Sequence, residues 1–264
     1  MNLFFKRTFS TVSGTLSFKG FLCLVIAVFL FTACAHRLEK RKKGAHTHYR
    51  LGVVYYKDHR IAESLKELNL AVDMDPKEPS YRVALGMAYL ARGLTTEAKK
   101  HINEAIRLKP DFSEARVNLA AVYLREGDWD GAIAECTRAL KNIYYKTPEA
   151  AYINIGWAYY NKGAYRAALE NFKKSVELNP RVPLARYNTG LTLEKMNMPG
   201  KAVKAYDSAI RLNPRYLEAY YRKGVALVKL KDRPGAIAAF KKVIELAPGS
   251  EKAASARDYI ELLK

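Results

Sequence analysis

Small and bulky apolar positions recur along this chain with one constant period. From Ala45 onward, each window of 34 residues carries small residues at its eighth and twentieth positions and bulky residues at its eleventh and twenty-fourth. Five prolines punctuate the same stretch at intervals of 34, 70, 34 and 34 residues, and 70 equals two periods plus two residues. The period defines six units, which are 45–78, 79–112, 113–148, 149–182, 183–216 and 217–250.

Each unit predicts two amphipathic helices, because apolar residues lie three and four apart and so share one helix face. The fifteenth position holds Gly or Asn in four units, and both accept the left-handed conformation that ends a helix. Small residues let the two backbones approach, and neighbouring pairs must stack to bury their apolar faces. The eighth-position residues are Gly52, Gly86, Ala120, Gly156, Gly190 and Gly224; the twenty-fourth-position residues are Leu68, Ile102, Cys136, Phe172, Tyr206 and Phe240.

This order of small and bulky positions resembles that of the tetratricopeptide repeat, over about four-fifths of the chain. The resemblance implies an all-α fold, a right-handed α-solenoid of about six helix-turn-helix repeats. Residues 251–264 are then expected to form a helix that caps the last repeat. Cys136 stands at a bulky core position, and we interpret it as a small core residue rather than a reactive thiol.

In tetratricopeptide domains the first helix of each repeat lines a concave groove, mainly at positions two, five, nine, twelve and thirteen. The resemblance carries this groove onto mostly apolar or aromatic residues here, about half of which we expect to pack between repeats. Such a groove suits an apolar or amphipathic segment of a protein partner. A carboxylate clamp needs Lys at position five and Asn at nine, which these repeats do not supply. The predicted groove residues are Tyr49, Val53, Tyr56, Met87, Leu90, Leu124, Trp157, Tyr160, Tyr187, Leu191 and Tyr221.

The start of the chain has the features of an export signal. Lys6, Arg7 and Lys19 make it positive, and residues 1–33 contain no acidic side chain. The uncharged run from Phe21 to Ala35 has 15 residues. A membrane-spanning helix needs about 20 apolar residues, whereas the apolar region of a leader has roughly 7 to 15. The length therefore favours a leader over a spanning helix or a short buried helix.

The sequence Phe31-Thr32-Ala33-Cys34 resembles the lipobox of bacterial lipoproteins. The resemblance implies that residues 1–33 are a signal peptide and that Cys34 carries the lipid. Residues 34–44 then form a basic tether beside the membrane, with five Lys or Arg side chains and one Glu. An ordinary leader with an incidental cysteine and an uncleaved anchor are the alternatives. We interpret the His-Thr-His at residues 46–48 as linker rather than as a metal-binding pair.

Charge and composition narrow the function further. The formal net charge is +19, or about +16 without the three positive charges of residues 1–33. Pairs of lysines at 99–100, 173–174 and 241–242 fall on second helices, which form the convex face. Because an exported protein does not meet nucleic acid, that face suits anionic lipid, lipopolysaccharide or an acidic protein, or is only solvated. Three cysteines exclude a disulfide framework. No motif indicates a catalytic site, a metal site or a cofactor, so we expect a protein that is not an enzyme.

These features predict a lipid-anchored scaffold for protein–protein interaction, on the periplasmic side of the bacterial outer membrane; the inner membrane is the alternative. A lipid anchor before about six repeats resembles the pilotin lipoproteins of type IV pilus systems. That resemblance implies capture of a secretin subunit and help with its assembly or localisation. Two alternatives stay open. One is a general adaptor that recruits peptidoglycan hydrolases or proteases, and the other is a regulatory module that binds a peptide or a glycan.

Overall fold

The structure is a computed structural model that describes the backbone of residues 18–264 and the side chains from His36 onward. Most of the predicted signal peptide, and the side chain of Cys34, lie outside this description. Residues 18–264 form thirteen α-helices and no strand. The helices are α1 Phe18–Lys57, α2 Ile61–Met74, α3 Pro79–Ala91, α4 Thr95–Leu108, α5 Ser113–Glu126, α6 Trp129–Leu140, α7 Pro148–Asn161, α8 Tyr165–Leu178, α9 Pro183–Lys195, α10 Pro199–Leu212, α11 Leu217–Lys229, α12 Arg233–Leu246 and α13 Glu251–Leu262.

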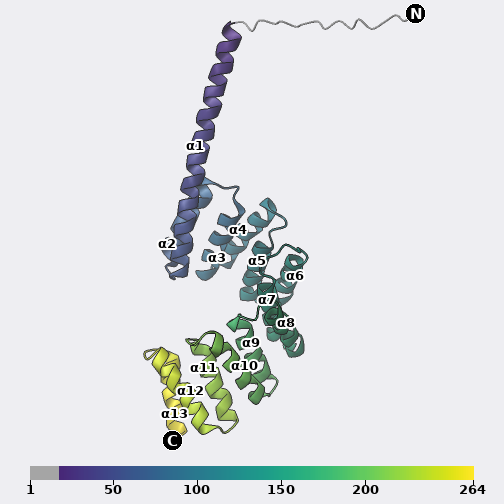
Figure 1. The fold of residues 1–264 in the computed structure, drawn as a ribbon, viewed down its shortest axis with the longest axis vertical. Helices are drawn as coiled ribbons and strands as arrows, with labels where there is room; N and C mark the ends of the chain where they lie inside the picture. Colours follow the sequence, from purple (N-terminus) through teal and green to yellow (C-terminus); the bar gives the residue numbers. More distant parts are fainter. Residues whose placement is uncertain (1–17) are drawn as a thin grey trace, which may run out of the picture.

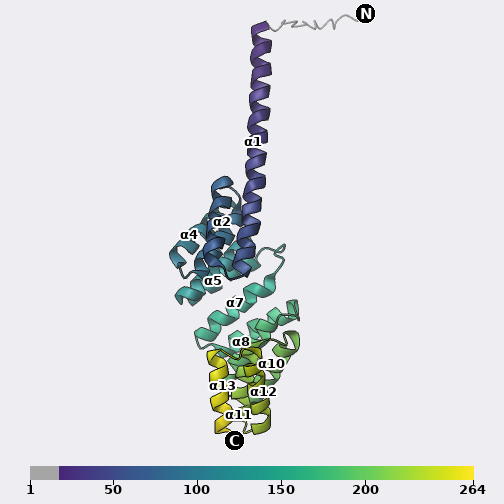
Figure 2. The same ribbon diagram turned by 90° about the vertical axis from the view of Figure 1, so that its left-hand side faces the viewer.

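Consecutive helices pack as pairs, and the pairs stack into a curved array (Figure 1). Each of the six units corresponds to one pair, from α1–α2 to α11–α12, although α1 begins before the first unit, and α13 covers the end of α12. From α3 to α12 the first helix of each pair lies on the inner side of the arc and the second helix on the outer side (Figure 1). The view turned by 90° shows successive pairs rotating about the long axis (Figure 2). The all-α solenoid expected from the repeat pattern is therefore confirmed.

The small residue at the eighth position of each unit marks the point where the paired helices cross. A Cβ added at Gly86 would lie 2.6 Å from a carbon of Ile102, and one added at Gly224 would lie 2.6 Å from Cε1 of Phe240. Both of these bulky partners occupy the twenty-fourth position and are fully buried. Glycine is required here because only a residue without Cβ permits this approach. The Ser64 hydroxyl, at a small position of the first unit, donates to the Gly52 carbonyl at 2.8 Å.

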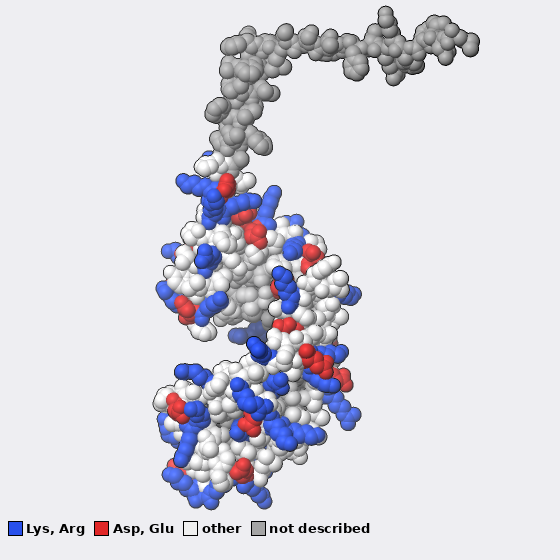
Figure 3. Space-filling view, in the orientation of Figure 1, with Lys and Arg blue, Asp and Glu red and all other residues white. Residues whose placement is uncertain are grey.

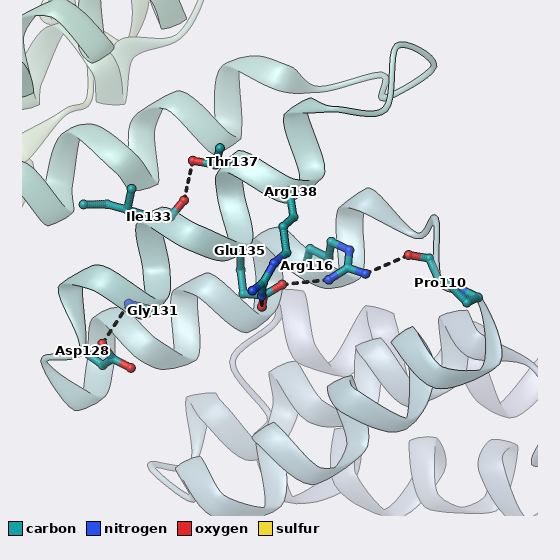
Figure 4. Close-up of polar contacts among 8 residues, drawn as sticks. All are labelled: Pro110, Arg116, Asp128, Gly131, Ile133, Glu135, Thr137 and Arg138. Carbon is teal, nitrogen blue, oxygen red and sulfur yellow. Dashed lines mark hydrogen bonds and ion pairs between the residues drawn. The ribbon is translucent and has the colours of Figure 1, made fainter.

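An arginine near the start of several first helices ties each pair to the one before it. Arg82 donates to the carbonyl of Pro76 at 2.9 Å, and Arg116 and Arg186 make the same contact with Pro110 and Pro180. The accepting carbonyl follows the end of the previous helix, where carbonyls lack helical partners. Figure 4 shows this contact for Arg116.

Arg116 also anchors the second helix of its own repeat. Its Nη1 lies 3.0 Å from Oε2 of Glu135 on α6, and Glu135 pairs with Arg138 as well (Figure 4). The Glu135 side chain is only 9% exposed, so its charge needs these partners. The start of α6 is capped by Asp128, whose carboxylate accepts from the backbone N–H of Gly131 at 2.8 Å (Figure 4).

The expected basic tether has a regular structure. Residues 34–44 are helical and continue without interruption into the first helix of the first repeat, so that α1 projects beyond the stacked pairs (Figure 1). Side chains from His36 to Lys43 are exposed, as expected for a charged segment. The His-Thr-His is not linker, however, because it lies within α1. Nδ1 of His48 is 2.6 Å from Oε2 of Glu67, and this contact holds α1 against α2.

The two residues beyond the regular period extend the connection between α6 and α7. Asn142 organises this loop, since its side chain donates to the Asp111 carbonyl and the Ser113 hydroxyl and accepts from the N–H of Tyr144. Tyr145 is 8% exposed and belongs to the core around Cys136. Ile143 and Tyr144 of the same loop are exposed, so the longer connection projects at the surface and the stacking of helix pairs continues across the junction.

Candidate protein-binding groove

The first three repeats form an apolar pocket on the first-helix face. Its volume is 260 Å³, and α1, α3 and the start of α5 build it. Apolar surface dominates the walls, and the lining residues that carry polar groups are Tyr49, Tyr56, Ser80 and Asn118. The lining residues are Tyr49, Val53, Tyr56, Leu68, Ser80, Val83, Ala84, Met87, Phe112 and Asn118. Such a pocket has the chemistry of a site for an apolar anchor with a few orienting hydrogen bonds.

In the last three repeats, a series of aromatic rings lies on or beside the first helices. Trp157 and Tyr160 stack along α7 with ring centroids 4.9 Å apart and planes tilted by 9°. Tyr187 on α9 lies 5.1 Å from the ring of Tyr216 and 5.8 Å from that of Tyr206. Burial raises the pKa of the Tyr160 and Tyr187 hydroxyls, so both stay neutral donors at physiological pH. Neutral hydroxyls on apolar rings are typical of protein-binding surfaces.

A carboxylate lies beneath these rings. The Glu194 side chain is 6% exposed and accepts a hydrogen bond from the hydroxyl of Tyr206. Arg222 and Lys229 of α11 approach the same carboxylate at 3.7 Å and 4.0 Å. Two cations therefore face one buried anion, which leaves net positive charge at this end of the face.

The structure places the predicted groove residues in three settings. Tyr49, Val53, Tyr56 and Met87 come together in the pocket of repeats 1–3. Leu90 and Leu124 pack against core clusters, as Tyr221 does near the C-terminus. The remaining residues, Trp157, Tyr160, Tyr187 and Leu191, surround one further core cluster, in which Leu191 is only 6% exposed. Leu191 therefore supports the aromatic surface from below and offers little surface of its own.

Besides Leu68, which was expected in the core, three pocket residues lie outside the predicted groove positions. Phe112 lies in the connection before α5, and Ala84 on α3 and Asn118 on α5 both occupy the sixth position of their repeats. The groove was expected at positions two, five, nine, twelve and thirteen of each first helix, and none of the three residues occupies one of these. The signal for Phe112 was present, because a large aromatic residue directly precedes the helix, where it can pack under its neighbours.

The inner side of the arc is hollowed between the repeats near the two ends of the chain, and Lys and Arg side chains lie on both borders (Figure 3). The three lysine pairs predicted on second helices lie on α4, α8 and α12. Basic side chains outnumber acidic ones over the face shown (Figure 3). Positive charge on the inner borders favours partners with acidic residues.

Comparison with known families decides the class of protein. Sequence profiles of the tetratricopeptide repeat match residues 83–148 and 193–251, and a further one matches residues 149–182. The match to residues 149–182 covers the pair α7–α8, and the other two ranges span helices from α3 to α6 and from the end of α9 to α12. The chain is a tetratricopeptide-repeat protein. A search of curated proteins found no match.

Solved tetratricopeptide-repeat structures share this architecture at low sequence identity. The pilF protein of Pseudomonas aeruginosa is 17% identical with a TM-score of 0.67, over 83% of this chain and 99% of its own. PilW, described as a widely conserved type IV pilus biogenesis factor, is 18% identical with a TM-score of 0.72, over 81% of this chain and 98% of its own. YrrB, described as having an unusual peptide-binding site, is 18% identical with a TM-score of 0.50, over 72% of this chain and 97% of its own.

The tetratricopeptide-repeat fold is a scaffold for protein interaction, and this chain has its repeats and solenoid. Within the part that the structure describes, no three His, Cys, Asp or Glu side chains are grouped closely enough to hold a metal ion. A search of the described residues also found no helix with the length and hydropathy needed to span a membrane.

Proposed function

We propose that this tetratricopeptide-repeat protein is a lipid-anchored scaffold of the bacterial cell envelope that captures an apolar segment of a partner protein during type IV pilus assembly. The pocket of repeats 1–3 carries the proposal, because it presents mostly apolar walls with a few polar side chains that can orient a ligand. The aromatic surface of repeats 4–6 extends the contact. The partner is a secretin subunit, whose apolar segment would be shielded until the ring forms.

Two observations support the assignment to pilus assembly. The chain covers 99% of pilF and 98% of PilW, so their whole repeat arrays correspond to this one. The lipobox-like sequence ending at Cys34 supports attachment to a membrane, and the exposed basic segment of α1 would lie beside that membrane. Ala35 after the lipidated cysteine favours the outer membrane, with the repeats in the periplasm.

Capture of a purified secretin subunit tests the pocket. Tyr56→Ala and Met87→Ala each remove a wall and should weaken binding by about tenfold or more, as expected for central anchors. Leu178→Ala, which changes a 52% exposed leucine at the end of α8, is the matched control and should bind as the unmodified chain does. Capture of peptidoglycan hydrolases in place of the secretin would favour the adaptor instead.

The membrane anchor has an independent test. Metabolic labelling with a radioactive fatty acid should mark the protein, and Cys34→Ser should remove the label. If unmodified protein stays unlabelled, the lipid anchor is refuted while the groove proposal stands. In cells, deletion of the protein should reduce secretin multimers and surface pili, and unchanged amounts of both would contradict the role in assembly.

A further inference from the structure

A second cavity lies on a different face of the array, between α8, α9 and α10. Its volume is 620 Å³, more than twice that of the groove pocket. On α9 it uses Arg186, Thr189 and Leu193, whereas Tyr187 and Leu191 belong to the aromatic surface and the core beneath it. With 3.6 residues per turn, these two sets point about 145° apart around α9. The cavity, which we call the α9 trough, is therefore separate from the proposed protein-binding surface.

The α9 trough has an apolar floor and a basic rim. The rim carries Lys173 and Glu177 on α8, Lys204 on α10 and Arg186 at the start of α9, which gives it a net charge of +2. Thr189 donates its hydroxyl to the Ala185 carbonyl at 2.8 Å, so its methyl group remains to face the trough. The remaining lining residues are Leu169, Val176, Thr189, Leu193, Ala205 and Ser208.

The trough is open because repeat 5 lacks the side chains that fill the same place in repeat 4. Where repeat 5 has Thr189 and Leu193, repeat 4 has Ile155 and Tyr159 at the corresponding positions, and both pack onto the core. Tyr152 of repeat 4 stands where repeat 5 has Arg186, and the ammonium of Lys174 lies 5.6 Å from its ring centroid. The smaller side chains of α9 thus leave apolar surface uncovered.

In the following repeat an ion pair closes the equivalent space. Lys223 on α11 lies 2.6 Å from Asp207 on α10. The residues at the same two positions in the α9 trough are Thr189 and Lys173, so no pair of opposite charges spans it there. Arg186 likewise differs from Arg116, because the residue of its own repeat that corresponds to Glu135 is the uncharged Ala205. Lys173 lies 3.5 Å from Glu177 on its own helix, so Arg186 and Lys204 are the rim cations most available to a ligand.

The dimensions select the kind of ligand. From Leu169 to Glu177 the trough extends for about 12 Å, at about 1.5 Å per helical residue. This is too short for a standard protein interface of about 800 Å² per partner. The volume instead lies within the range of small-molecule sites, roughly 300–1,000 Å³. We propose that the α9 trough binds a single-chain anionic amphiphile, with the acyl chain along Leu169, Val176 and Leu193 and the carboxylate or phosphate beside Lys173, Lys204 or Arg186.

Photocrosslinking of the full chain tests this site directly. The probe is a twelve-carbon carboxylate with a diazirine in its chain, and mass spectrometry locates the crosslinked residues. We expect crosslinks within 169–208, and at least tenfold fewer with the matched alkylamine, because its cation meets a basic rim. The double substitution Thr189→Ile with Leu193→Tyr copies repeat 4, fills the trough and should reduce labelling at least tenfold.

Charge variants provide a second test of the site in case the variant with Thr189→Ile and Leu193→Tyr, here called the refilled variant, folds poorly. Lys173→Gln with Lys204→Gln should reduce labelling at least threefold, whereas Lys241→Gln, an exposed lysine on α12, should leave it unchanged. Equal labelling by the alkylamine, or unchanged labelling of the refilled variant with native helix content, would overturn the proposal. Two further outcomes would overturn it. One is crosslinking of the trough by diazirine-bearing phosphatidylglycerol in vesicles but not by the carboxylate. The other is crosslinking of the trough by a diazirine-bearing acidic amphipathic peptide but not by the carboxylate.

Discussion

Gly156 and Phe172 meet at the crossing of α7 and α8 so closely that a Cβ on Gly156 would lie 2.6 Å from Cε1 of the ring. The ring is fully buried and cannot move outward into solvent. At the same crossing in the third repeat, the larger Ala120 replaces the glycine and the smaller Cys136 replaces the aromatic residue. The size of one position therefore depends on the size of the other.

Gly156→Ala should destabilise the protein by about 1–2 kcal/mol. Overpacking of a core costs about 1–3 kcal/mol, and the better helix propensity of alanine returns at most about 1 kcal/mol. Gly200→Ala is the matched control, since no atom lies within 4 Å of its added Cβ, and it should be neutral or slightly stabilising. Urea denaturation measures both, and equal stability of the two variants would contradict the steric account.

The third repeat offers the reciprocal test. Cys136→Phe inserts a ring against the Cβ of Ala120 and should lower the free energy of unfolding by about 2 kcal/mol or more. Adding Ala120→Gly recreates the pair found in the fourth repeat and should recover part of this loss. A double-mutant cycle by thermal or urea unfolding measures the coupling. Additive effects of the two substitutions on the free energy of unfolding would show that the two positions are not energetically coupled.

Arg116→Ala should destabilise the array by about 2 kcal/mol, because it removes the bond to the Pro110 carbonyl and one partner of Glu135. Arg138 still faces Glu135 and limits the loss. Arg107→Ala, which removes an exposed partner of Glu104, should change stability by less than about 0.5 kcal/mol. A similar loss for both arginines would mean that the Arg116 contacts contribute no more than a surface pair.

Alkaline pH should unfold the protein through its buried tyrosines. Burial raises the pKa of Tyr145 to about 12, whereas the unfolded side chain ionises near 10. The stabilisation is therefore complete below pH 10 and is lost as the pH rises toward 12, by about 2–3 kcal/mol for this group. Tyr145→Phe should flatten this part of the stability curve. An unchanged slope of the free energy of unfolding between pH 10 and 12 would contradict the assignment.

The residues of the candidate site could be predicted from the sequence only where their position in the repeat decides whether the side chain is exposed. Tyr49, Val53, Tyr56 and Met87 reach the pocket because positions five, nine and twelve point inward on every first helix. Phe112 was missed because it lies in a connection between helices, where helical periodicity does not indicate which way a side chain points. The burial of Leu191 and Glu194 was also missed, since it depends on how the bulky Tyr206 of the next helix fills the space beside them.

The sequence by itself determined the period, the number of helix pairs and the class of fold. Those properties follow from local spacing, since a small residue at position eight and a large one at twenty-four are read within a single unit. Only the tertiary structure decided that residues 34–57 form one helix, that Phe112 closes the pocket and that the α9 trough stays open. Each of these depends on side chains of different repeats filling, or failing to fill, one shared space, and close packing is a property of that space rather than of any one segment.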